Sequence, residues 1–134
     1  MLPMVWWQQL ALVMAGGALG AAGRFWLSGL LLRQLGQGFP WGTLAVNLIG
    51  SFFAGFLIIW LEARGPSAIY WRAFLLVGIM GGLTTFSALM VECLMFAKTD
   101  RNELMLLYLG TSLIAGLLAI WMGSRFAQAF VTSI

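Results

Sequence analysis

Charged side chains are scarce in this sequence. Only 8% of its 134 residues are Asp, Glu, Lys or Arg, while 62% are apolar, against the roughly 25% of charged residues in ordinary soluble domains. This composition excludes a water-soluble fold. Because about 20 apolar residues span the hydrocarbon core of a bilayer, the chain has room for four crossings and little else. We therefore expect a single all-α transmembrane domain over residues 1–134.

Histidine is absent, cysteine occurs once, and only four residues are acidic. Such a set lacks the ligand clusters of zinc and iron sites, which excludes metalloenzyme chemistry, and no enzymatic function is expected. The lone Cys93 cannot form an intrachain disulfide. The net charge of +3 is spread over short loops, so the basic stripe of a nucleic-acid-binding protein is missing. No Lys or Arg precedes the first apolar run, which we expect to be a retained helix and not a signal peptide.

Charges, glycines and prolines divide the chain into four apolar segments. We expect transmembrane helices at about Trp6 to Leu32, Gly42 to Leu61, Arg72 to Ala97 and Leu104 to Ala127. The connections are short, which is typical of a bundle of helical hairpins. Tryptophans gather near the segment ends, where the headgroup region favours amphipathic rings. The lipid bilayer is thus the first predicted partner of this chain.

The charges in the loops do not select an orientation. Lys and Arg in short loops normally mark the cytoplasmic side. Here each side would carry three, with Arg64, Arg72 and Arg125 beside the termini and the second loop, and Arg33, Lys98 and Arg101 opposite. Either a weak bias escapes this count or the protein inserts both ways round. Insertion both ways would allow an antiparallel homodimer whose two-fold axis lies in the membrane plane.

Polar and small residues share one face of the second span. They recur at helical spacing at Thr43, Asn47, Gly50, Ser51 and Ala54. Polar groups at membrane depth must find partners or line a wet path. The Asn47 amide offers two donors that could replace water around an anion without the cost of a full charge. The alternative is a hydrogen bond that joins two helices.

Glycine and threonine interrupt the third span. Gly78, Gly81, Gly82, Thr84, Thr85 and Ser87 follow one another closely, so we predict a break in this helix near Gly81 to Thr85. A discontinuous membrane helix exposes backbone carbonyls that can hold a cation and a half-helix N-terminus that can attract an anion. For Gly16 and Gly20 in the first span, close packing of two helices is the preferred interpretation.

Five more residues are candidates for a functional role. Phe86 follows the predicted break, and the positive edge of an aromatic ring can meet an anion. Tyr108 and Ser112 are four residues apart and share a face of the fourth span, where they either extend a polar track or bond to the backbone. Arg24 lies inside the first span, where a cation could draw anions inward. Glu92, in the third span, is either an ion-pair partner or a proton carrier.

Three ordered motifs resemble the Fluc (CrcB) family of fluoride channels. They are the glycine-rich run 16–20 continued by Gly23-Arg24-Phe25, the stretch from Gly42 to Asn47, and the stretch from Gly81 to Ser87 with Glu92 behind it. The resemblance implies an antiparallel, dual-topology homodimer in the inner membrane of a prokaryote. It also implies passive, fluoride-selective efflux that protects the cell from fluoride.

The same resemblance implies roles for individual residues. The backbone carbonyls of Gly81 and Thr84 from both subunits would hold a structural Na⁺ at the dimer centre. The anion pathway would include Asn47, Thr43, Phe86, Ser87, Tyr108, Ser112 and Arg24, the last in a vestibule. This chain departs from the family at Ala88 and Leu89, where the family has Thr and a second Phe. Either the single ring suffices with Ser87 and Asn47, or conduction is reduced.

Two other functions compete with a passive anion channel. A proton-coupled exporter of small cationic drugs has a similar size and a possible dual topology, but it needs a carboxylate inside the membrane. Only Glu92 could serve, because the interiors of the first, second and fourth spans have no acidic residue. A purely structural membrane subunit would leave the Thr43 and Asn47 face and the broken third helix without a purpose.

Overall fold

The computed structural model describes the backbone of residues 2–133 and the side chains of residues 6–133. Four helical rods make up the fold, and no strand occurs among these residues. The first rod is α1 (Leu2–Leu35), the second α2 (Trp41–Glu62) and the fourth α6 (Asn102–Thr132). The third is composite and contains, in order, the 3₁₀ turn η1 (Gly65–Ala68), α3 (Ile69–Trp71), the π-helix η2 (Arg72–Met80), α4 (Gly81–Leu83) and α5 (Phe86–Lys98).

All four rods are long and apolar enough to cross a membrane, which confirms the four predicted spans. Their bounds differ from the predicted ones by several residues. The helices α1 and α6 continue beyond Leu32 and Ala127, and the third rod begins at Gly65, ahead of the predicted Arg72. At 1.5 Å per residue, the 22 residues of α2 cover about 33 Å, close to the roughly 30 Å of the hydrocarbon core. The chain is therefore a multi-pass helical membrane protein.

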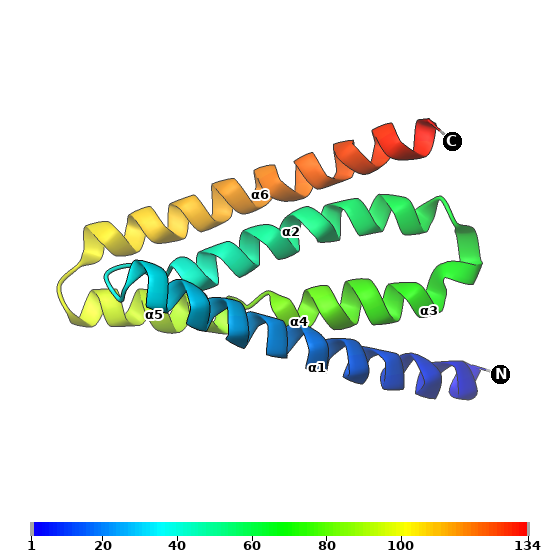
Figure 1. Ribbon diagram of the computed structural model, residues 1–134, viewed down its shortest axis with the longest axis horizontal. Helices are drawn as coiled ribbons and strands as arrows, with labels where there is room; N and C mark the ends of the chain where they lie inside the picture. The colour runs from blue at the N-terminus through cyan, green and yellow to red at the C-terminus, as the bar shows by residue number, and fades with distance from the viewer. Residues whose placement is uncertain (1, 134) are drawn as a thin grey trace.

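The two ends of the bundle carry different parts of the chain (Figure 1). Both termini and the turn from α2 into the third rod lie at one end, and the other two loops lie at the opposite end. This arrangement agrees with the sides assumed when the loop charges were counted. It also makes α2 and α6 run in the same direction, side by side, while α1 packs against η2 and α4.

Glycines bring these rods into backbone contact. A Cβ on Gly16 or Gly20 of α1 would overlap a carbonyl oxygen of η2, and a Cβ on Gly55 of α2 would overlap the carbonyl of Ile120 in α6. Because no side chain separates the helices at these points, α1 and α2 approach their partners as closely as backbones allow. The packing interpretation of Gly16 and Gly20 is confirmed.

The third rod breaks at two threonines. Thr84 (φ −85°, ψ 153°) and Thr85 (φ −149°, ψ 121°) are extended, and α5 starts with the next residue. The predicted break between Gly81 and Thr85 is confirmed, although Gly81 itself is still helical. The π-helical geometry of η2 was not predicted. The hydrophobic pattern of a membrane segment does not show whether each backbone N–H donates to the carbonyl four or five residues earlier in the chain.

Few side chains are buried within one copy of the chain. Leu44, Leu89, Cys93, Phe96 and Tyr108 form a small cluster between α2, α5 and α6. Large apolar side chains cover the outside, with Phe25 84% and Trp26 68% exposed. An outer surface of this kind suits hydrocarbon, because lipid tails are as apolar as the side chains themselves.

Candidate functional site: the broken third helix

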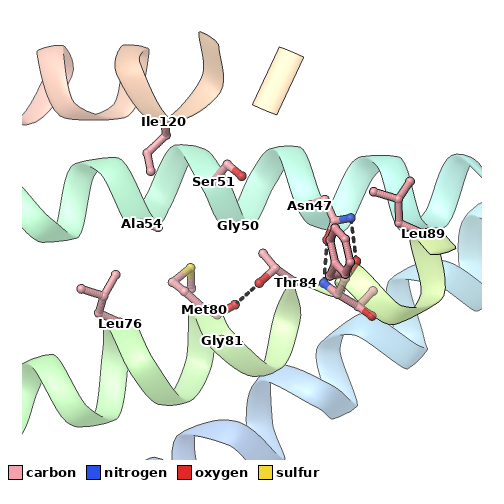
Figure 2. Close-up of a pocket in the computed structure, with 12 residues that line it drawn as sticks. Asn47, Gly50, Ser51, Ala54, Leu76, Met80, Gly81, Thr84, Leu89 and Ile120 are labelled. Carbon is pink, nitrogen blue, oxygen red and sulfur yellow. Dashed lines mark hydrogen bonds between the residues drawn. The ribbon is translucent and has the colours of Figure 1, made fainter. Parts of the chain in front are cut away.

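Asn47 of α2 holds the break in place. Its Nδ2 donates to the Thr85 carbonyl at 3.0 Å, and its Oδ1 accepts from the Thr85 N–H at 2.7 Å, as the dashed lines of Figure 2 show. One side chain thus satisfies both backbone groups of an extended residue at membrane depth, where an unpaired group costs several kcal/mol. The alternative interpretation of Asn47, a hydrogen bond between two helices, is thus confirmed, and its role toward an anion stays a prediction. The second N–H of the amide is not used in this pair.

The two hydrogen bonds between Asn47 and Thr85 leave a carbonyl on the other side of the break without its helical donor. In a continuous α-helix the Thr85 N–H would donate to the Gly81 carbonyl, but here it donates to Asn47. The next carbonyl, that of Gly82, accepts instead from Arg24 Nε at 3.1 Å. Arg24 therefore neutralises the C-terminal end of the first half-helix, where the helix dipole favours a cation.

The start of α5 is capped by the chain itself. Thr85 Oγ1 accepts from the Ala88 N–H at 3.1 Å and lies 3.3 Å from Ser87 Oγ. This side-chain cap takes up one of the free N–H groups at the half-helix N-terminus. Phe86, the first helical residue, points outward and is 70% exposed.

These groups line an open groove of about 400 Å³. Residues from both sides of the break meet residues of α2 and α6 in it, namely Asn47, Gly50, Ser51, Ala54, Leu76, Met80, Gly81, Thr84, Thr85, Phe86, Leu89 and Ile120. Figure 2 shows Gly50 opposite Thr84, whose hydroxyl donates to the Met80 carbonyl at 2.9 Å. The groove therefore brings together Asn47, Phe86, Gly81 and Thr84, which the sequence singled out separately.

A second polar cluster lies between α2, α5 and α6. The Glu92 carboxylate accepts from Thr43 Oγ1 at 2.6 Å and from the Tyr108 hydroxyl at 2.5 Å. Tyr108 is fully buried and Thr43 nearly so. Sequence reasoning flagged all three residues but did not join them, because they come from three different spans. Glu92 thus has hydroxyl partners, and its pairing with an Arg is not seen among the described residues.

Among the described residues, the hydroxyl oxygen of Ser112 is the one buried side-chain polar atom that lacks a hydrogen-bond partner. It lies one helical turn after Tyr108 on α6, on the same face. A buried hydroxyl in a membrane helix costs free energy unless another group accepts a hydrogen bond from it. The Ser112 hydroxyl is therefore available to a ligand, whereas the Thr43 and Tyr108 hydroxyls donate to Glu92.

Metal-binding side chains do not gather in the part of the chain that the structure describes, where no group of three His, Cys, Asp or Glu is close enough to hold an ion. Backbone oxygens are the remaining donors. Gly81 and Thr84 both line the groove. The Thr85 N–H, which would donate to the Gly81 carbonyl in a continuous helix, donates to Asn47 instead. A carbonyl in this state fits a hard monovalent cation, as in other broken membrane helices.

Taken together, the four apolar rods, the interrupted third helix and the polar groups at the interruption define an ion- or solute-conducting membrane protein. Broken helices of this kind build transport sites at membrane depth, because their unpaired backbone groups are available to a solute. Residues 11–124 match the family model described as CrcB-like protein, Camphor Resistance (CrcB). The chain belongs to this family.

Curated relatives cover almost the whole chain. A protein of Xanthomonas axonopodis pv. citri, named fluoride-specific ion channel FluC, is 56% identical over 128 residues, which are 96% of each chain. A protein of the same name from Xylella fastidiosa strain 9a5c is 58% identical over 95% of this chain and 88% of its own length. Another from Hydrogenovibrio crunogenus is 40% identical over 86% of this chain and 87% of its own length.

Proposed function

We propose that this protein is a fluoride channel that lets fluoride leave the cell passively, and that it is not an enzyme. The carrying observation is similarity along nearly the full length to relatives named for fluoride, at 56–58% identity. An excess of cytoplasmic fluoride would then flow out down its own gradient. Since the relatives are bacterial and the spans are helical, we place the channel in the inner membrane.

The pathway that we propose follows the polar groups of α2 and α6. At the groove, the spare N–H of Asn47 and the outward ring of Phe86 offer a donor and a positive ring edge. On α6, the Ser112 hydroxyl, which has no hydrogen-bond partner, supplies another donor. The Thr43 and Tyr108 hydroxyls, which donate to Glu92 in this structure, would have to turn toward the anion to serve it. Ser87 and Arg24 add positive or donor groups on either side of the break. Neutral donors bind an anion while letting it leave.

We further propose an antiparallel homodimer. A lone subunit would turn the groove, with its Gly81 and Thr84 carbonyls, toward lipid, where each unsatisfied group costs several kcal/mol. A second copy related by a two-fold axis in the membrane plane would cover the groove with the same groove. Three cationic residues at each end of the bundle are compatible with insertion in both orientations.

The cation expected at the centre of this dimer is Na⁺. Two copies would bring four carbonyls together, two from Gly81 and two from Thr84, and their partial negative charges would repel one another without a cation between them. The ion would be structural, since it would join the two broken helices and take no part in conduction. Replacing Na⁺ with a large organic cation should therefore destabilise the dimer in detergent, and unchanged dimer stability would contradict the site.

Fluoride efflux from liposomes tests the proposed function. Vesicles that contain the purified protein and fluoride should lose fluoride when a potassium ionophore supplies counter-charge, and should retain chloride. The alternative is a proton-coupled exporter, in which Glu92, the only acidic residue away from the ends of the four spans, would exchange protons for a cationic drug. Drug-stimulated proton flux without fluoride loss would establish that alternative, and equal loss of both anions would indicate an unselective pore.

Labelling of single cysteines tests the dual topology. Gln37 lies in the loop between α1 and α2, and Ser67 lies in η1. These two segments are at opposite ends of the bundle (Figure 1), and each residue can be replaced by Cys in a Cys93→Ser background. An impermeant thiol reagent applied to intact cells should label a part of each population. Complete labelling at one position and none at the other would show a fixed orientation, and the antiparallel dimer would then be wrong.

A further inference from the structure

A basic cavity lies at the end of the bundle that carries the termini, far from the broken helix. It has a volume of about 490 Å³ and is lined by Trp60, Ala63, Arg64, Ser67 and Val131. Three of these residues come from the end of α2 and the turn that follows, one comes from η1, and Val131 comes from the last turn of α6. None of them belongs to the proposed ion pathway.

The position of this cavity corresponds to the headgroup layer. The 22 residues of α2 suffice to cross the hydrocarbon core, and α2 ends at Glu62, so Arg64 and Ser67 lie just past the acyl chains. Trp60 is half-buried one turn earlier, at the depth that amphipathic rings prefer. Phosphate groups of lipids are therefore the most concentrated anions next to Arg64.

The guanidinium of Arg64 lies against the Trp60 ring. Its central carbon is 4.0 Å from the ring centre, and this cation–π contact favours a position of the charge beside the cavity. The N–H groups in its plane stay available, and their fork matches two oxygens of one phosphate. The exposed Ser67 hydroxyl, which donates to the Arg64 carbonyl at 3.2 Å, can turn to donate to the same phosphate.

The remaining walls decide between a lipid and a free anion. Trp60, Ala63 and Val131 are apolar, and a free phosphate would gain nothing from them, whereas the glycerol and upper acyl carbons of a lipid would. We propose that this cavity binds the headgroup of an anionic phospholipid through its phosphate, with Arg64 as the principal ligand. Arg125 lies at the same end of the bundle but does not line this cavity, so it can serve as a control. Its guanidinium carbon is 6.0 Å from the centre of the Trp121 ring, and its side chain donates a hydrogen bond to Gln128.

Lipid binding can be measured on the full-length protein in detergent by native mass spectrometry and by thermal unfolding. Phosphatidylglycerol should bind and raise the melting temperature, and phosphatidylcholine with the same acyl chains should do so much less. Arg64→Gln should weaken phosphatidylglycerol binding by about tenfold or more, since a bidentate charge-assisted contact is lost. The matched variant Arg125→Gln should bind like the natural protein, and Trp60→Leu should give an intermediate loss because the charge stays while its support is removed.

Three results would overturn the proposal. Equal losses in Arg64→Gln and Arg125→Gln would reduce the effect to general surface charge. Equal binding of the two lipids would mean that the net negative charge of the headgroup is not recognised, because both lipids carry the phosphate. Stabilisation by inorganic phosphate alone, to the same extent as by phosphatidylglycerol, would indicate a free-anion site. Fluoride efflux measured in parallel should be the same for Arg64→Gln and the natural protein in vesicles of neutral lipid, so this test is independent of the channel function.

Discussion

Gly50 offers a sharp test of how the broken helix is held. A Cβ at this position would lie well under 3.0 Å from the Thr84 methyl carbon, while its other neighbours would be in ordinary contact at 3.7 Å. Thr84 cannot easily turn away, because its hydroxyl donates to the Met80 carbonyl at 2.9 Å. Gly50→Ala should therefore push the break away from α2 and lower both the stability of the protein and its fluoride efflux.

The magnitude follows from two opposing terms. Overpacking of a well-packed site costs typically about 1–3 kcal/mol, and replacing Gly by Ala within a helix recovers up to about 1 kcal/mol. Gly17→Ala isolates the second term, since a Cβ on Gly17 would meet nothing within 4 Å. The difference between the two variants in the free energy of unfolding should thus be about 1–3 kcal/mol.

Thr84→Ser completes the test, because serine lacks the methyl carbon and keeps the hydroxyl. In the double variant Gly50→Ala/Thr84→Ser the overlap is gone, so the Gly50→Ala penalty should vanish and efflux should recover. Unfolding in detergent gives the coupling free energy of this double-mutant cycle, which should be close to the whole overpacking cost. Additive effects of the two substitutions would refute the assigned contact between Gly50 and Thr84.

Three further predictions address the pathway and the packing of the helices. Phe86→Ile should greatly lower fluoride efflux without loss of the folded protein, because this exposed ring contributes its edge and little packing. Normal efflux in liposomes would mean that the ring edge takes no part in conduction. Tyr108→Phe should destabilise the protein by about 1–3 kcal/mol in detergent unfolding, since the Glu92 carboxylate loses a buried donor, and an unchanged stability would mean that water replaces the hydroxyl. Gly55→Ala should push α2 away from α6 and lower the free energy of unfolding, because the added Cβ would overlap the Ile120 carbonyl. Gly116→Ala has open space around its Cβ and should leave the free energy of unfolding nearly unchanged in the same assay.

The spans and the break could be predicted because both depend on local composition. Long apolar segments bounded by charges set the four rods, and the glycine and threonine run located the interruption to within a few residues. The extended residues themselves, Thr84 and Thr85, could not be identified in advance. Their position is decided by Asn47, which lies 38 residues away in the chain and supplies the hydrogen bonds that the helix gives up.

The roles of the membrane-depth charges also depend on distant partners. Arg24 was expected in a vestibule as an attractor of anions, a role that stays a prediction, and the structure additionally pairs it with the Gly82 carbonyl. Glu92 was recognised as unusual, but its hydroxyl donors Thr43 and Tyr108 come from other helices. Hydrophobic periodicity gives the face of one helix and not the residue that meets it across an interface, so such pairs need the folded arrangement.

The π-helical stretch η2 affects how the chain can change in length. A π-helical turn holds more residues than an α-helical turn, so residues 72–80 contain surplus backbone just ahead of the break. Loss of one residue there would tighten the stretch toward an ordinary α-helix and leave Thr85 within reach of Asn47. Deletion of one residue ahead of Asn47 in α2 would rotate Asn47 by about 100° relative to the first turn of its helix. Its two hydrogen bonds to Thr85 would then be lost. Deletions of single residues during the evolution of this family should therefore be tolerated in η2 and rejected in α2 ahead of Asn47.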